Sequence, residues 1–185
     1  MFAANSRLER VDPASTAALA VALGGTAAIL GAYFFQYVIG LPPCPLCLDQ
    51  RIPYYIAIPL AVLIAIASIR HAPRGLLAGG LVVLAVIMIV GAGLGVYHAG
   101  IEWKLWAGPQ DCSGPMNPLG GGGGLLRQLE ETRVVRCDEA AWRFLGLSLA
   151  GWNVLISLAL AAVATWGGNE TLRRVSPQGS SSVSQ

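Results

Sequence analysis

Long apolar stretches without charge alternate with short charged segments along the chain. Four intervals contain no Asp, Glu, Lys or Arg, and they are bounded by Asp12 and Asp49, Arg51 and Arg70, Arg74 and Glu102, and Arg143 and Glu170. A helix that crosses the hydrocarbon core of a bilayer needs about 20 mostly apolar residues, and each interval can hold one. The pattern predicts an all-α membrane protein, an antiparallel bundle of four transmembrane helices near residues 16–39, 52–69, 76–98 and 145–166.

Prolines and glycines punctuate two of these spans. Pro53 and Pro59 lie in the second span, where neighbouring helices can satisfy the carbonyl groups that proline leaves free, so they indicate a kink or a late helix start. Gly91 and Gly95 in the third span have a small-xxx-small spacing, which allows two helices to approach closely. We therefore expect these glycines to lie at a helix–helix contact.

The first span follows Arg7 and Arg10, as the hydrophobic region of a secretory signal would. Its uncharged run is much longer than the roughly 7–15 residues of such a region, so we expect it to stay as a membrane anchor. Residues 1–167 are predicted to form one membrane domain, with a long loop at 99–144 between the third and fourth spans. The serine-rich end of the chain predicts a disordered tail over residues 168–185.

The distribution of arginines favours one orientation in the membrane. Four spans place both termini on the same side as the turn Arg70–Arg74, which has two arginines in five residues and no acid. The 99–144 loop mixes five cations with six acids. Because short loops rich in Lys and Arg stay in the cytoplasm, both termini are predicted to be cytoplasmic and the long loop to lie on the opposite side.

The composition excludes other classes of protein. Charged residues make up 12% of the chain and hydrophobic residues 55%, with a mean hydropathy of +0.60, which excludes a disordered protein. Lys and Arg number 12 against 10 for Asp and Glu, too small a surplus for a nucleic-acid-binding surface. We expect partners in and at the membrane, and no nucleic acid.

All four cysteines lie outside the predicted spans, on the side opposite the termini: Cys44, Cys47, Cys112 and Cys137. An even number of cysteines on an oxidising side of a membrane is typical of two disulfides. Cys44-Pro45-Leu46-Cys47 is a C-x-x-C motif. Its bond would close a very small ring that restricts an unfolded chain little, so its value is redox more than structural.

Two local structures are compatible with the C-x-x-C motif. In a helix that begins here, Pro45 suits the first turn, and Arg51 follows Cys47 at i,i+4 on the same face. The helix N-terminus and the arginine would then both favour the reactive thiolate. In the alternative, Pro53 begins the helix and the motif lies on a loop. A metal site is a further use of C-x-x-C, but a cation beside the thiolates disfavours it, and we expect no metal.

Cys112 and Cys137 lie in the long loop, and a bond between them would close about 26 residues. The chain-entropy model gives such a bond roughly 3–4 kcal/mol, so a static structural disulfide is one interpretation. The many Gly and Pro residues between them, including the run Gly120–Gly124, predict an open and mobile segment instead. A disulfide in such a segment is easily reached by another protein's thiolate, and we favour an exchangeable bond.

Aromatic residues gather on the same side as the cysteines: Tyr97, Trp103, Trp106 and Trp142. Tyr and Trp commonly form a belt at the membrane interface, which is the simplest interpretation. His98 ends the third span at about the depth where Arg51 begins the second. Together the two side chains could donate hydrogen bonds to the polar ring of a lipid-soluble quinone, although His98 could equally be a satisfied interfacial histidine.

These motifs resemble those of one family closely, the bacterial disulfide-bond formation protein B (DsbB) family. The resemblance rests on Cys44-Pro-Leu-Cys47 with Gln50-Arg51, on Tyr97-His98-Ala-Gly-Ile-Glu102 leading to Trp106 and Cys112, and on Cys137-Asp-Glu-Ala-Ala-Trp142-Arg-Phe-Leu-Gly-Leu147. With the four spans, it covers nearly the whole chain except the termini. It implies an enzyme of the bacterial inner membrane that reoxidises a periplasmic DsbA-type thiol oxidase and passes the electrons to a membrane quinone, ubiquinone or menaquinone.

The resemblance also implies a role for each cysteine. Cys112 resembles the cysteine that forms the mixed disulfide with the partner protein, and Cys137 resembles its mate. Cys47 resembles the cysteine whose thiolate makes the charge-transfer contact with the quinone, and Cys44 its partner. Electrons would pass from the reduced partner to the Cys112–Cys137 pair, then to the Cys44–Cys47 pair, and then to the quinone.

Arg51 resembles the cation on the quinone side, and His98 resembles a family histidine with one residue of slip. Three other interpretations stay open at this point. One is a tetraspan metal handler that uses the cysteines and His98, and another is a non-catalytic membrane protein with two static disulfides. The third is a quinone reductase of the vitamin K epoxide reductase type, in which the C-x-x-C lies late in the bundle instead of at the entry to the second span.

Overall fold

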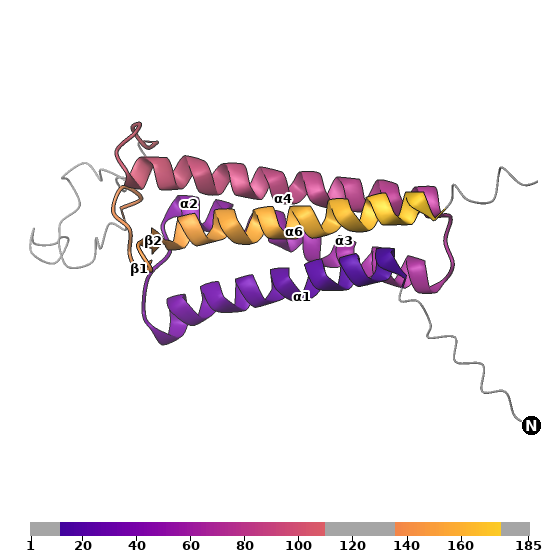
Figure 1. Ribbon diagram of the computed structural model, residues 1–185. Coiled ribbons are helices and arrows are strands. Elements are labelled where there is room, and N and C mark those ends of the chain that lie inside the picture. Colours follow the sequence, from indigo (N-terminus) through magenta and orange to yellow (C-terminus); the bar gives the residue numbers. More distant parts are fainter. Residues whose placement is uncertain (1–11, 110–135, 175–185) are drawn as a thin grey trace, which may run out of the picture.

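The computed structural model describes residues 12–109 and 136–174. Four long helices run side by side (Figure 1): α1 (Pro13–Tyr33), α3 (Ile52–Ile69), α4 (Arg74–Glu102) and α6 (Leu149–Arg173). A π-helical turn, η1 (Phe34–Val38), continues α1, and a short helix, α2 (Pro45–Asp49), precedes α3. Within the described ranges, four segments are long and apolar enough to cross a membrane: Pro13–Val38, Pro45–Ile69, Arg74–Glu102 and Leu149–Arg173. The predicted four-helix membrane bundle is confirmed.

Small residues allow the helices to pack closely. A Cβ atom at Gly95 of α4 would lie 2.8 Å from Cγ2 of Val154 on α6. One turn earlier, a Cβ at Gly91 would lie 3.3 Å from Pro53 of α3 and 3.4 Å from Oγ of Ser157 on α6. Both glycines therefore lie at helix–helix contacts, as their spacing predicts.

The inner and outer surfaces of the bundle differ in side-chain size. Alanines fill much of the centre, together with fully buried larger side chains of α4 such as Leu84 and Met88. Large apolar side chains point outward, among them Leu23, Leu63 and Leu76. An outer surface of this kind would be costly in water and is the natural partner of lipid chains.

A short hairpin lies at the same end of the bundle as α2 (Figure 1). Its strands β1 (Arg143–Phe144) and β2 (Leu147–Ser148) pair antiparallel, with Phe144 opposite Leu147. Gly146 in the turn has φ of 82°, a conformation that a side chain would oppose. Ser148 then begins α6, because its Oγ accepts a hydrogen bond from the Gly151 amide at 3.2 Å.

The ends of three helices differ from those that the apolar pattern predicts, since α1 begins earlier, at Pro13, and α4 and α6 continue further, to Glu102 and Arg173. The expected disordered tail over 168–185 is therefore wrong for residues 168–173. Helix α6 persists there because Gly167 packs directly on Ala17 of α1, and the buried Thr171 donates a 2.7 Å hydrogen bond to the Gly167 carbonyl. The rest of the tail and the run Gly120–Gly124 lie outside the described residues.

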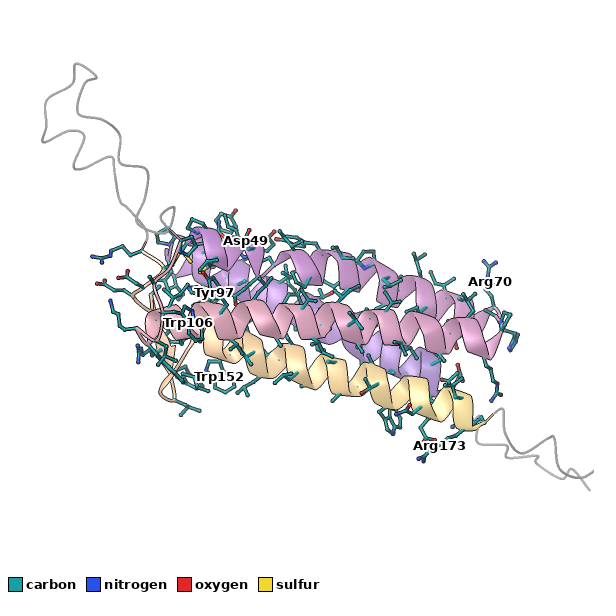
Figure 2. All side chains as sticks on the ribbon, turned by 90° about the horizontal axis from the view of Figure 1, so that it is seen from above. Asp49, Arg70, Tyr97, Trp106, Trp152 and Arg173 are labelled. Carbon is teal, nitrogen blue, oxygen red and sulfur yellow. The ribbon has the colours of Figure 1, made fainter. Side chains whose placement is uncertain are left out.

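The two ends of the bundle have different chemistry (Figure 2). Arg70 and Arg173 lie at one end, and Asp49, Tyr97, Trp106 and Trp152 at the other. The start of α1 belongs to the arginine end, because Ser68 near the end of α3 donates a hydrogen bond to the carboxylate of Asp12. The start of α1 and the end of α6 thus lie at the end of the bundle opposite the C-x-x-C motif. That the arginine end faces the cytoplasm stays a prediction.

Candidate active site

The C-x-x-C motif forms the first turn of α2. Cys44 is the N-cap residue, with Pro45 next to it, and its sulfur accepts a hydrogen bond from the Cys47 amide at 3.2 Å. The two sulfur atoms are 2.7 Å apart. None of the described cysteines is disulfide-bonded in this structure. The contact with Cys47 and burial raise the pKa of the Cys44 thiol.

The structure agrees with one part of each alternative: the motif is helical, and a separate helix begins next to Pro53. The motif is helical, but the helix is interrupted at Gln50 and Arg51, and α3 begins at Ile52 with Pro53 in its first turn. The side chains of Cys47 and Arg51 therefore do not share one continuous helical face. They still line the same cavity, because the interruption lies at the cavity wall.

Arg51 is a buried cation that two residues of the first helix hold in place. Its Nη1 donates a 2.8 Å hydrogen bond to Oε1 of Gln36, and its guanidinium lies 5.3 Å from the centre of the Tyr33 ring. Gln36 belongs to the π-helical turn η1, a type of distortion that is frequent at functional sites. No carboxylate of the described residues forms an ion pair with Arg51. Its positive charge is therefore available to a ligand in the cavity.

His98 lies beside the C-x-x-C motif and is only 3% exposed. Its Nε2 is 3.7 Å from the Cys44 sulfur and 3.8 Å from Oε1 of Glu102, while Nδ1 is 2.6 Å from the amide nitrogen of Gln50. His98 and Arg51 both line the cavity, and their position side by side stays a prediction. The ring, however, is engaged by Cys44 and Gln50, and its contact with a quinone stays a prediction.

Sequence reasoning assigned no role to three polar residues of this region, Gln50, Glu102 and Asn153. Gln50 and Glu102 are buried, and Glu102 Oε2 is the one buried side-chain oxygen or nitrogen of the described residues without a hydrogen-bond partner. Asn153 Nδ2 donates to Gln50 Oε1 at 2.8 Å. For Asn153 the available signal was a polar residue inside a predicted apolar span, which is costly in a membrane and therefore often functional.

Cys137 packs against the C-x-x-C motif. It is fully buried and forms an apolar cluster with Cys44, Leu46 and Ile101, with Cys47 at the edge. The sequence predicts an accessible bond in a mobile loop, yet in this structure its Cys137 end is enclosed. Its mate, Cys112, lies outside the described residues.

Ion pairs hold the segment that carries Cys137. Asp138 accepts hydrogen bonds from Lys104 Nζ at 3.1 Å and from Arg136 Nη2 at 2.9 Å. These two cations lower the pKa of Asp138 to about 2. The carboxylate therefore stays charged at neutral pH and ties residues 136–138 to the end of α4.

A cavity of about 740 Å³ opens beside Cys47. Polar residues line one part of it, among them Cys47, Arg51 and His98, whereas aromatic and aliphatic side chains such as Phe35 and Trp142 form most of the wall. Trp142, expected in an interfacial belt, lies with its ring centre 4.6 Å from that of Phe35. A cavity with one polar end and apolar walls suits a ligand with a polar head and an apolar tail.

A metal could in principle use part of this site. The sulfur atoms of Cys44 and Cys47 and a ring nitrogen of His98 lie within 4.8 Å of one another. The guanidinium of Arg51 lines the same cavity as Cys47 and opposes a second cation there. The arrangement is better suited to thiol–disulfide exchange than to metal binding.

Comparisons with known proteins agree with this chemistry. A family model described as "Disulfide bond formation protein DsbB" matches residues 14–167. A protein named "Disulfide bond formation protein B" from Marinobacter nauticus is 32% identical over 158 residues, which cover 80% of this chain and 85% of that protein. A protein of the same name from Xanthomonas campestris pv. campestris is 33% identical over 143 residues, which cover 74% and 80%. No solved structure matches the chain significantly.

Proposed function

Because the chain belongs to the DsbB family of disulfide bond formation proteins, we propose that it is a membrane thiol:quinone oxidoreductase. In this proposal it reoxidises a periplasmic, thioredoxin-like protein of the DsbA type and passes the electrons to ubiquinone or menaquinone. The family makes it an oxidoreductase of disulfide formation, and the four apolar helices make it a multi-pass membrane protein. The bacterial inner membrane and cytoplasmic termini are part of the proposal.

One observation carries the proposal: the C-x-x-C motif touches two environments. Cys44 shares a buried cluster with Cys137, whereas Cys47 lies at the edge of that cluster and lines the large apolar cavity. A pair of sulfurs 2.7 Å apart therefore connects the cysteine of the loop with a space suited to a lipid-soluble ligand.

The residues of the cavity fit a quinone. Its volume of about 740 Å³ lies in the range of small-molecule sites, and Phe35 and Trp142 provide aromatic surface. Arg51 offers donors for an oxygen of the ring, since only its bond to Gln36 is used within the described structure. A bound quinone would supply an acceptor of two electrons that stays in the lipid phase.

The cysteines would carry the electrons by thiol–disulfide exchange. When the partner's dithiol has been oxidised at the Cys112–Cys137 bond, a Cys137 thiolate attacks the Cys44 sulfur of the oxidised motif. A Cys44–Cys137 bond forms, the Cys44–Cys47 bond breaks, and the electron pair leaves on Cys47. The packing of Cys137 on Cys44 and the position of Cys47 at the cavity support this direction of exchange.

Anaerobic mixing of the purified protein with a reduced thioredoxin-like partner and quinone tests the function. We expect the quinone absorbance to change in proportion to the disulfides formed in the partner, and C47S to abolish both. H71N is a suitable control, because His71 lies in the turn between α3 and α4 at the opposite end of the bundle. Oxidation of the partner with no reduction of quinone would overturn the proposal.

A further inference from the structure

A chain of hydrogen bonds runs from the centre of the bundle to the C-x-x-C motif. Tyr54 OH lies 2.8 Å from Ser157 Oγ and donates to Asn153 Oδ1, also at 2.8 Å. Asn153 Nδ2 donates to Gln50 Oε1 at 2.8 Å, and Gln50 Nε2 lies 2.6 Å from His98 Nδ1. The chain joins α3, α6 and α4, and it ends at His98 Nε2, 3.7 Å from the sulfur of Cys44.

Each bond in this chain has a defined direction. An amide nitrogen can only donate, so Nδ1 of His98 accepts from Gln50 and carries no proton. In a neutral imidazole the proton is then on Nε2. Gln50 cannot turn its amide over without losing the bond from Asn153, and Asn153 is held in turn by the hydroxyl of Tyr54.

The Nε2–H of His98 points into the redox site. The Cys44 sulfur lies 3.7 Å and Glu102 Oε1 3.8 Å from this nitrogen, and the backbone of Cys137 is also close to the ring. Cys47 and Arg51 share the cavity with His98, and Cys137 packs on Cys44 from the loop. The proton on Nε2 also blocks the lone pair that a metal ion would need at this atom.

We propose that Gln50 and Asn153 are positioning residues that hold His98 with its proton on Nε2, so that the ring donates a hydrogen bond to the Cys44 sulfur. This bond acts when Cys44 receives electrons: Cys112 forms a bond with Cys137, the Cys44–Cys137 bond breaks, and the electron pair leaves on Cys44. A buried sulfur surrounded by apolar side chains holds a negative charge poorly, and a hydrogen bond from Nε2 lowers that cost. The inference rests on the proposed function for this exchange step, but the tautomer itself does not.

Nitrogen NMR of the reduced full-length protein reports the tautomer directly, in the absence of quinone. The chain has two histidines, so 15N-histidine labelling gives two rings, and H71N assigns the signals of His98. We expect an unprotonated Nδ1 and a protonated Nε2. The opposite tautomer in the unmodified chain would overturn the proposal.

The substitution Asn153→Asp reverses the direction of the hydrogen bonds that run from residue 153 through Gln50 to His98. A carboxylate cannot donate to Gln50, so Gln50 turns its amide group and offers its oxygen to Nδ1. We expect the proton of His98 to move to Nδ1 in N153D, and Q50L to give a mixture of both tautomers. The same chemical change at the exposed Asn169 of α6, N169D, leaves the tautomer as it is. An unchanged tautomer in both N153D and Q50L would overturn the positioning role.

The reactivity of Cys44 provides a second readout that is independent of quinone. The measurement compares the double variant C47S/N153D with C47S, in which Cys44 has lost its usual partner. Because N153D removes one hydrogen bond to the Cys44 thiolate, we expect alkylation of Cys44 at a fixed pH to be about tenfold slower. The pH profile of the reaction moves to higher pH, and N169D does not move it. Equal profiles for N153D and its parent would show that His98 does not act on this sulfur. Failure of quinone reduction with the expected tautomer would instead refute only the proposed function.

Discussion

The guanidinium of Arg51 donates a 2.8 Å hydrogen bond to Oε1 of Gln36, and this bond joins the start of α3 to the π-helical turn after α1. The π-turn is the place where the first helix departs from regular geometry, and Gln36 is the residue that it presents to the arginine. The pair forms part of the cavity wall beside Cys47. A charged side chain in an apolar bundle is thus held by a neutral partner and keeps its positive charge for other contacts.

Substitution of Arg51 by alanine should weaken quinone use and spare thiol exchange. Loss of a charged donor costs about 1.5–3 kcal/mol, so we expect the KM for quinone to rise about 10- to 100-fold. Exchange between the partner protein and Cys112 should keep its rate. The measurement is steady-state quinone reduction with stopped-flow oxidation of the partner, and R70A at the opposite end of the bundle is the matched control. An unchanged dependence on quinone would make Arg51 a purely structural residue.

Cys44 and Cys137 should form a disulfide when their usual partners are removed. Both side chains lie in one buried cluster, so the double variant C47S/C112S leaves each with the other as its neighbour. We expect mild oxidation to give a Cys44–Cys137 bond, detected by mass spectrometry of peptides under non-reducing conditions. The variant C44S/C112S, which leaves Cys47 with Cys137, should form much less of its bond. Equal yields in the two variants would contradict the proposed order of exchange.

Asp138 should control the accessibility of Cys137. Its pKa, lowered to about 2 by Arg136 and Lys104, lies below the value of about 3.9 for a free Asp. A carboxyl group with a lowered pKa stabilises the folded segment above that free value, and the contribution is lost as the pH falls through about 2. We expect D138N to expose Cys137 at neutral pH, measured as faster labelling by a pyridyl disulfide reagent.

The control for this experiment is E139Q. Glu139 is a neighbouring acid that is 71% exposed, and its 4.0 Å contact with Arg136 is longer than the 2.9 Å contact that Asp138 makes. In the unmodified protein, the labelling rate of Cys137 relative to unfolded protein should increase between about pH 4 and pH 2. A rate that is the same in D138N and E139Q would show that the ion pairs do not retain this segment.

Gly95 should tolerate no side chain. A Cβ there would lie 2.8 Å from Val154 and 3.3 Å from the carbonyl of Ala150, so G95A forces α4 and α6 apart. We expect a loss of about 1–3 kcal/mol of stability, measured by thermal unfolding in detergent. Gly93 on the same helix has no atom within 4 Å of its Cβ position, and G93A should be neutral or slightly stabilising. Equal losses in G95A and G93A would mean that the effect does not come from the helix contact.

The sequence predicted the four helices because the hydropathy of each apolar segment is enough to show that the segment can enter the bilayer. A segment without charge must satisfy its own backbone as a helix wherever it enters the hydrocarbon core, and this can be read from hydropathy alone. The helix ends were less predictable. Residues 168–173 are helical because Gly167 finds room against α1 and Thr171 is buried, and neither contact is visible in the local composition.

The candidate site also combines features that local sequence predicts with features that depend on distant contacts. Cys44, Cys47 and Arg51 lie within eight residues, so short-range spacing was sufficient to group them. The interruption between α2 and α3 was not predicted, since the sequence suggested either a helical motif or a helix that begins at Pro53, and the chain forms a helix at each place. Glu102 and Asn153 received no role, because their partners lie on other segments of the chain.

The amino-acid sequence by itself determined a four-span membrane protein with a pair of cysteines at the end of a helix, since these features depend on hydropathy and on residues close together in the chain. Tertiary structure alone decided which polar groups meet. Gln50 and Asn153 are 103 residues apart, and their hydrogen bond depends on the rotation of α6 about its axis and on the placement of the α2–α3 interruption against it. That rotation is set by the close packing of helices at small residues such as Gly91, a property of surfaces in contact that no single segment contains.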